Sequence, residues 1–173
     1  RRHAARDHQR RLCHQERVPL VPRGAGTGYS GGAVPTSGGV VVSLERLDQI
    51  LEIDRENLLA RVQPHVVTGD LQDAVEREGL FFPPDPASLR RSVIGGNLAE
   101  CAGGPRAFKY GTTRRYVLGL EVVLPGGNRL AFDTEEVIAG MHPGWTPPTG
   151  PGRVAIAFEL GVPAAVDAMY ERL

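Results

Sequence analysis

A chain of 173 residues is about one domain long and can bury one hydrophobic core. Its 20 basic and 20 acidic residues cancel, so charge gives no reason to expect nucleic acid or an anionic membrane as the main partner. No apolar run is long enough to span a bilayer, and the charged N-terminus carries no secretory signal. The two cysteines, Cys13 and Cys101, lack the spacing of a metal site and suit a reducing compartment. We therefore expect a cytoplasmic protein without a bound metal.

The sequence of the first sixty or so residues predicts short helices and strands. A short helix is expected over Arg11–Glu16 and a brief strand over Val18–Pro22. The continuous β-branched run Val40–Leu44 predicts a buried strand. Ile50–Ile53 and Leu58–Val62 flank a polar turn, which is the pattern of a hairpin.

Val66–Glu78 is the clearest helical segment. Thr68 or Asp70 can cap its start, and Gly79 stands where a helix commonly ends. The face expected to be buried is formed by Val67, Leu71, Ala74 and Val75.

The next segments alternate between irregular chain and strands. Phe81–Ser88 is too rich in proline to be regular, and Ser92–Gly104 consists mainly of small residues and glycine. A strand is expected over Tyr116–Leu124, followed by the turn Pro125–Asn128 and a second strand over Arg129–Phe132.

The most informative segment is the glycine-rich stretch that begins at Arg23. Glycines alternate from Gly24 to Gly28, so successive peptide N–H groups can point into one concavity that binds a phosphate or a pyrophosphate. Thr27 and Ser30 add hydroxyl donors, and Arg23 adds positive charge.

Two familiar phosphate-binding motifs do not fit this stretch. Gly26–Gly31 matches the dinucleotide pattern G-x-G-x-x-G, but the nicotinamide-type Rossmann fold needs a helix to begin there. The segment Gly31–Gly39 contains proline and several glycines and cannot hold that helix. A P-loop is also excluded, because no Gly-Lys-Ser/Thr follows.

Further motifs follow the loop in a fixed order. They share small residues, prolines and short polar side chains, and they are Arg61–Pro64, Pro84–Ser88, Ser92–Asn97, Ala99–Gly104, Lys109–Thr113 and Val117–Gly127. Together they resemble the FAD-linked oxidases of the vanillyl-alcohol oxidase (PCMH-type) superfamily, nearest the branch of glycolate oxidases and of D-lactate and D-2-hydroxyglutarate dehydrogenases. The resemblance implies an α+β fold: an incomplete PCMH-type FAD-binding domain over residues 12–128, with residues 1–11 unassigned.

The resemblance also implies which residues hold the cofactor. The pyrophosphate would lie on Arg23, Gly24, Ala25, Gly26, Thr27, Gly28, Ser30, Gly31 and Gly32. The flavin side would be lined by Pro84, Asp85 and Ser88. The ribityl and ring parts would be surrounded by Ser92, Gly95, Gly96 and Asn97. The rest of the surface on which the cofactor lies would be formed by Ala102, Gly103, Gly104, Tyr110 and Gly111. Small residues suit a flat ring lying on backbone.

The implied activity is oxidation of a D-2-hydroxy acid of the glycolate or D-lactate type by hydride transfer to flavin. Some relatives tether flavin through a loop histidine, but Thr27, Gly28 and Tyr29 stand here, so we expect non-covalent FAD. Electrons would pass to an acceptor subunit, a quinone or cytochrome, or O₂. No catalytic residue is identified, because the family places the base in a part that this chain lacks. Asp85 is a possible acid, although its flanking prolines favour a structural turn.

Residues 129–173 differ in sequence pattern from the segment before them. A strand over Val154–Leu160 and a helix over Ala164–Leu173 predict a short β-α fragment. This segment is similar to part of a glyoxalase/bleomycin-resistance (vicinal oxygen chelate) protein, without a histidine that would hold its metal. A fragment or chimaeric reading frame is therefore expected. A flavin-binding module without activity and a vicinal-oxygen-chelate protein are the alternatives to an active oxidase.

Overall fold

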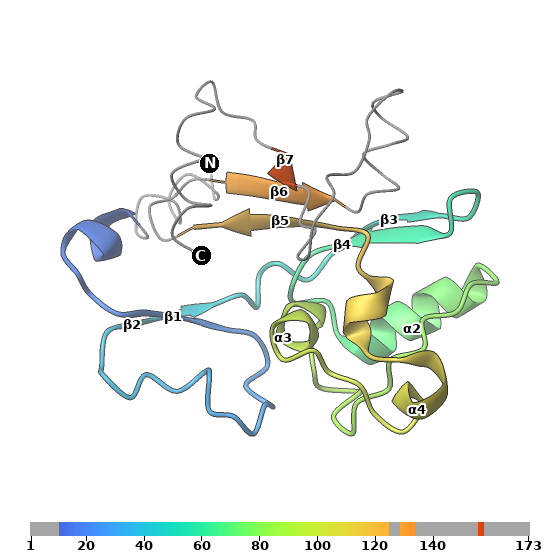
Figure 1. Ribbon diagram of the computed structural model, residues 1–173, viewed down its shortest axis with the longest axis horizontal. Coiled ribbons are helices and arrows are strands. Elements are labelled where there is room, and N and C mark those ends of the chain that lie inside the picture. Colours follow the sequence, from blue (N-terminus) through green and yellow to red (C-terminus); the bar gives the residue numbers. More distant parts are fainter. Residues whose placement is uncertain (1–10, 125–128, 134–155, 158–173) are drawn as a thin grey trace, which may run out of the picture. The chain divides into compact units, whose positions relative to one another are not determined.

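The computed structural model describes residues 11–124, 129–133 and 156–157, and the chain divides into two compact units (Figure 1). One unit is continuous, from Leu12 to Val117. The other comprises Arg1–Arg11 and Leu118–Leu173. The predicted site residues all lie in the continuous unit.

Residues 11–15 are helical, as expected, and the continuous unit then forms a parallel pair of strands. Strand β1 (Leu20–Arg23) pairs with β2 (Val40–Ser43) in the register Leu20 to Val40. The expectation that the second strand is buried was wrong, because Val40 and Val41 are 41% and 38% exposed. The physical reason is that these two strands form a sheet of their own, which leaves most of β2 without covering side chains.

The predicted hairpin is confirmed as β3 (Ile50–Asp54) and β4 (Leu59–Val62), which pair antiparallel. Asp54 shapes the turn, since its Oδ1 accepts hydrogen bonds from the backbone N–H groups of Glu56 and Asn57. These bonds and the Asn57 side-chain amide lower the pKa of the Asp54 carboxyl, with the side-chain bond as the largest cause.

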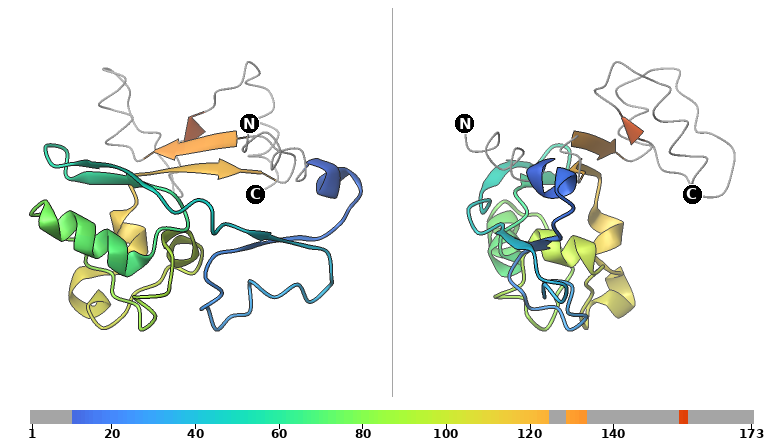
Figure 2. Two further views of the ribbon diagram at one scale, coloured as in Figure 1. Left: turned by 180° about the vertical axis from the view of Figure 1, so that it is seen from behind. Right: turned by 90° about the vertical axis from the view of Figure 1, so that its left-hand side faces the viewer.

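Helix α2 (Thr68–Arg77) confirms the predicted helix and runs along the hairpin (Figure 2). Leu71 and Val75 pack in the core with Val66 and Ile94, while hairpin side chains cover them. Gly79 follows the helix with a φ of 76°, the left-handed conformation expected of a glycine that ends a helix.

The predicted helix cap was wrong. Val67 is the N-cap, and no side chain caps the helix. Thr68 is fully buried, and its hydroxyl donates to the carbonyl oxygen of Ser92 over 3.1 Å instead of turning back to its own helix. The tertiary contact therefore replaces the local cap that the sequence suggests.

Three short helices follow where the sequence indicated only small or irregular segments. They are α3 (Ile94–Ala99), α4 (Ala107–Tyr110) and the 3₁₀ turn η1 (Thr113–Tyr116). Residues 81–86 have no regular structure, as their prolines predict. Helix α3 is anchored against the start of α2, because the Ile94 and Gly95 amides donate to the carbonyl oxygens of Val66 and Pro64.

The second unit contains a three-stranded antiparallel sheet. Strand β5 (Gly119–Val123) pairs with β6 (Arg129–Asp133), which also pairs with β7 (Ile156–Ala157). Strands β5 and β7 lie within two of the three strands predicted for this region, and β6 extends one residue beyond the third, to Asp133. The predicted turn over residues 125–128 and the predicted helix over residues 164–173 lie outside the described residues.

Candidate flavin-nucleotide site

The glycine-rich loop leaves the end of β1 and presents a row of unpaired backbone donors. Within the described part of the chain, none of the backbone amides from Gly24 to Ser30 donates a hydrogen bond. Gly26 takes a φ of 67°, which reverses the direction of its peptide plane without strain. Most of this loop is exposed, so its donors are open to a ligand. Such a run of free amides is suited to an anion.

The loop is held against α3 at its beginning. A Cβ placed on Gly24 would lie 2.7 Å from Cγ2 of Val93 and 3.9 Å from the backbone nitrogen of Gly96. Val93 is 1% exposed and cannot easily move aside. Glycine is therefore required at position 24 because the loop backbone passes directly over the first turn of α3.

The same helix holds the loop near its far end. The Ser30 hydroxyl donates to Oε1 of Glu100 over 2.6 Å. Cβ atoms placed on Gly28 and Gly32 would lie 3.5 Å and 3.6 Å from that same oxygen. Glu100 is the C-cap of α3, so the loop is fixed to both ends of one short helix.

The positive charge expected from Arg23 is shared with a carboxylate. Its guanidinium lies 3.4 Å from Oε1 of Glu45, and both side chains are well exposed. Exposed pairs of this kind contribute little to stability, so the arginine remains available to an incoming phosphate. Thr27 is half-buried, and its hydroxyl makes no hydrogen bond within the described residues.

Ser92 and Asn97 were predicted to hydrogen-bond the cofactor, but both side chains are buried in an internal network. The Asn97 amide donates to the Thr68 hydroxyl over 2.6 Å, and the Ser92 hydroxyl lies 3.1 Å from it. Ser92 and Asn97 are each 3% exposed. Their polar groups fix α3 against α2, so any direct contact with a ligand would come from backbone or from Gly95 and Gly96.

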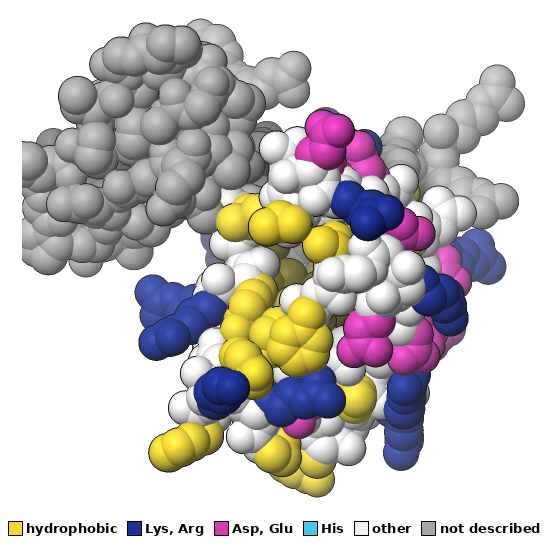
Figure 3. Space-filling view, turned by 90° about the vertical axis from the view of Figure 1, so that its right-hand side faces the viewer, with side chains coloured by type: hydrophobic (Ala, Val, Ile, Leu, Met, Phe, Trp, Pro, Cys, Tyr) yellow, Lys and Arg dark blue, Asp and Glu magenta, His cyan; other side chains and the backbone are white. Residues whose placement is uncertain are grey.

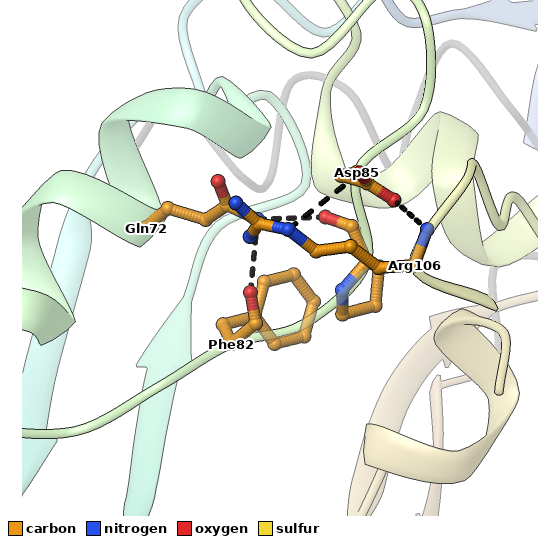
Figure 4. Close-up of polar contacts among 5 residues, drawn as sticks. Gln72, Phe82, Asp85 and Arg106 are labelled. Carbon is orange, nitrogen blue, oxygen red and sulfur yellow. Dashed lines mark hydrogen bonds and ion pairs between the residues drawn. The ribbon is translucent and has the colours of Figure 1, made fainter. Parts of the chain in front are cut away.

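Asp85 lies in the segment without regular structure and is held there by contacts with Gly103 and Arg106 (Figure 4 shows the contact with Arg106). Its Oδ1 accepts from the backbone N–H of Arg106 over 2.9 Å, and its own N–H donates to the carbonyl oxygen of Gly103. Gly104 has a φ of 108°, and a Cβ there would overlap the Asp85 carbonyl oxygen. These contacts give Asp85 a structural role in joining residues 84–88 to residues 102–106.

The residues near Asp85 are also held by contacts with backbone atoms. Pro84 is fully buried, and the Gln72 amide donates to its carbonyl oxygen over 2.8 Å and to that of Phe82 over 2.9 Å. The Ser88 carbonyl accepts from the amides of Arg91 and Ser92. Pro84 and Ser88 therefore shape the chain, and the sequence alone did not indicate Gln72 as the residue that holds it.

Tyr110 and Gly111 end helix α4 beside a partly exposed aromatic cluster. The Tyr110 ring packs edge-on against Phe81, and the Arg106 guanidinium lies 5.6 Å from the Phe81 ring centre. Gly111 has a φ of 86°, and a Cβ there would meet the Arg115 side chain. Figure 3 shows hydrophobic side chains gathered among Lys and Arg groups on this face.

Ala102 connects α3 to this cluster. Its N–H donates to the carbonyl oxygen of Asn97, and its own carbonyl accepts from both the N–H and the hydroxyl of Thr113. The predicted residues thus form one connected series of contacts, from the glycine loop to α3, then to Ala102–Gly104, and then to Asp85.

Cys101 lies next to Glu100 in the left-handed conformation, with a φ of 50°. Its Sγ lies 3.2 Å from the Thr112 hydroxyl. This hydrogen bond, together with the Arg114 amide and charge, lowers the pKa of the exposed thiol. Among the described residues, no group of three or more His, Cys, Asp and Glu side chains could hold a metal ion.

The comparisons with known proteins agree with this geometry. Residues 10–133 match the family model described as "FAD binding domain", and the chain belongs to this family. FAD is therefore its cofactor, and the partial domain combines helices and small sheets as the resemblance implied. None of the described helices has the length and apolar character needed to cross a membrane.

The chain is similar to two proteins of known name and to one solved structure in particular. The chain is 57% identical over 117 residues to glycolate oxidase subunit GlcD of Bacillus subtilis (strain 168), which covers 68% of this chain and 25% of that protein. It is 46% identical over 117 residues to D-lactate dehydrogenase of Anaerostipes hadrus, covering 68% and 24%. It also resembles the structure of an alkyldihydroxyacetonephosphate synthase, with a TM-score of 0.62 and 25% identity, over 75% of this chain and 25% of the other. The chain spans about a quarter of the length of each of these three proteins.

The residues present fit the diphosphate part of FAD in particular. A diphosphate is bound by several backbone N–H donors at close approach, and the loop offers N–H groups that no described residue accepts, with glycine at positions 24, 26 and 28. Glu100, Val93 and Gln72 support this site but were not predicted as site residues. Val93 and Glu100 stand within the motifs Ser92–Asn97 and Ala99–Gly104, so their sequence positions were a signal, whereas nothing in the sequence marks Gln72.

Proposed function

We propose that this chain supplies the diphosphate-binding part of an FAD-dependent oxidoreductase, and that the whole enzyme oxidises a D-2-hydroxy acid of the glycolate or D-lactate type. The observation that carries the proposal is the row of unpaired amides from Gly24 to Ser30, held beside α3. Similarity to glycolate oxidase subunit GlcD and to D-lactate dehydrogenase supports the substrate class.

The residues of this chain would bind and orient the cofactor. The loop amides would donate to the diphosphate, Arg23 would offset its charge, and Gly95 and Gly96 would let the nucleotide approach α3. FAD, when bound, supplies the acceptor for a hydride from the α-carbon of the hydroxy acid, which leaves a 2-oxo acid. We assign the hydroxyl proton to no residue of this chain.

We also propose that FAD is held without a covalent bond, because Thr27, Gly28 and Tyr29 offer no imidazole to tether it. A partner subunit that accepts electrons is supported by the relative named as a subunit of glycolate oxidase. A cytoplasmic location and a glyoxalase-like origin of residues 129–173 stay predictions.

A competition titration tests the binding part of this proposal. The purified chain is titrated with FAD and followed by the quenching of flavin fluorescence, and ADP, AMP and riboflavin are then added as competitors. Because the loop is proposed to hold the diphosphate, ADP should displace FAD better than AMP, and riboflavin should not displace it. Displacement by riboflavin but not by ADP would place the main contacts on the ring and contradict the proposal.

Anaerobic addition of glycolate, D-lactate and D-2-hydroxyglutarate to the flavin-loaded protein tests the reaction. Bleaching of the flavin absorption by one of these acids, and not by the L-lactate control, supports the oxidase. The alternative is a flavin-binding module without turnover. Bound flavin that none of the acids reduces would support that alternative.

A further inference from the structure

Ser30 and Glu100 form a clasp that closes the glycine-rich loop onto α3. The Ser30 hydroxyl lies 2.6 Å from Oε1 of Glu100, which is a short hydrogen bond from a hydroxyl to a carboxylate oxygen. A serine hydroxyl has one proton to donate. That proton is engaged with Glu100 and cannot at the same time be given to a phosphate, as the sequence suggested for Ser30.

The surroundings of the carboxylate support a positional role. Gly28 and Gly32 lie on either side of Ser30, and a Cβ on each would be in van der Waals contact with the same carboxylate oxygen, at 3.5 Å and 3.6 Å. The Glu100 carboxylate therefore lies close to the loop at Gly28 and Gly32 and accepts its hydrogen bond from Ser30. Because it caps α3, its backbone is fixed by the hydrogen bonds of its N–H to the carbonyl oxygens of Gly96 and Leu98.

Within the described residues, this contact is the one hydrogen bond that joins residues 24–30 to α3, which the loop also approaches closely at Gly24. In the described structure, no hydrogen bond is donated by the amides of residues 24–30, so they contribute nothing to holding the loop in place. An ordered set of free donors binds an anion more tightly than a mobile set, because the cost of ordering has already been met before binding. The clasp is the feature that supplies this order.

We propose that Glu100 is a positioning residue that holds the loop open for the flavin diphosphate through Ser30, and that its role depends on accepting a hydrogen bond and not on its charge. The inference rests on the proposed FAD-binding function. It reassigns Ser30 from a direct phosphate donor to the partner of Glu100.

Limited proteolysis of the flavin-free chain tests the clasp without any ligand. Tyr29 and Phe108 are both fully exposed, so chymotrypsin can report on each, and Phe108 in α4 serves as the internal control. Cleavage after Tyr29 should rise about tenfold in Ser30→Ala and Glu100→Ala, while Glu100→Gln, which keeps the acceptor oxygen, should behave as wild type. Cleavage after Phe108 should not change in any variant.

The affinity for FAD then tests the functional consequence. Ser30→Ala, Glu100→Ala and the double variant should each bind FAD about tenfold more weakly, with no further loss in the double variant, because both changes break one contact. Glu100→Gln should restore binding to within about threefold of wild type.

Three results would each overturn the clasp. The first is unchanged cleavage after Tyr29 in both alanine variants. The second is an additive loss of affinity in the double variant. The third is a loss of affinity in Ser30→Ala alone, which would return Ser30 to the phosphate. If wild type binds no FAD, the proposed function fails while the proteolysis result still stands.

Discussion

The contact between Gly24 and Val93 predicts that one added methyl group displaces the glycine loop. In Gly24→Ala the new Cβ would lie 2.7 Å from Val93 Cγ2, about 1 Å closer than the ~3.5–4.0 Å at which two carbon atoms rest. Val93 is 1% exposed and β-branched, so the loop must move instead. Overpacking of this kind costs about 1–3 kcal/mol in stability.

The effect on cofactor binding follows from the same displacement. A shift of about 1 Å lengthens an N–H to phosphate bond beyond the ~3.2 Å limit of a good hydrogen bond. Each bond to a charged group contributes about 1.5–3 kcal/mol, so losing one lowers the affinity for FAD about tenfold to hundredfold. Fluorescence titration with FAD measures this loss, and urea unfolding followed by circular dichroism measures the stability.

A double-mutant cycle identifies the cause. Val93→Ala removes Cγ2 and is itself expected to cost about 1–3 kcal/mol by leaving a cavity. In that background Gly24→Ala no longer meets Cγ2, so its effect on affinity should shrink to about threefold. Purely additive losses across the cycle would refute the steric reasoning, and the requirement for Gly24 would then have another origin.

Two further predictions concern the other glycines and the thiol. Gly104→Ala should lower the free energy of unfolding by about 3 kcal/mol or more, because its Cβ overlaps the Asp85 carbonyl oxygen in addition to the strain at positive φ. Gly79→Ala, which has a positive φ but open space around it, is the matched control and should lose only about 1 kcal/mol in urea unfolding; equal losses would contradict the overlap. The lowered pKa of Cys101 predicts that its alkylation by iodoacetamide, followed site by site by mass spectrometry, has its pH midpoint below that of the urea-unfolded protein. Thr112→Val should move that midpoint upward, because it removes the hydrogen bond that favours the thiolate, and an unchanged midpoint would exclude the bond as the cause.

Local chemistry made several elements predictable from the sequence. The helix stop at Gly79 and the hairpin turn at Asp54 depend on residues that are adjacent in the chain, and both are confirmed. The missed features depend on distant partners. Thr68 stands where a helix cap is expected, but its hydroxyl bonds to Ser92 across the fold, and α3 forms despite Gly95 and Gly96 because its first amides have carbonyl partners near α2.

The same distinction applies to the site. The glycine pattern predicts free amides because the conformational freedom of glycine is a local property, and the loop has them. Which polar side chains are free to meet a ligand is not a local property. Ser30, Ser92 and Asn97 all have suitable donors, but each donor is engaged by a residue far along the chain, and only the fold reveals those partners.

This difference gives the backbone and the side chains separate tasks in the site. If the side chains of Ser30, Ser92 and Asn97 are engaged with protein, recognition of a diphosphate falls to peptide N–H groups, whose number and direction no single side-chain substitution removes. Arg23 aside, substitutions are then expected to weaken binding by moving the loop, and the positions expected to be most sensitive are the two where the loop is held against α3, at Gly24 and at Ser30. A loop with this property needs a fixed support more than it needs particular polar residues, and the short helix α3, anchored by buried polar contacts to α2, provides that support.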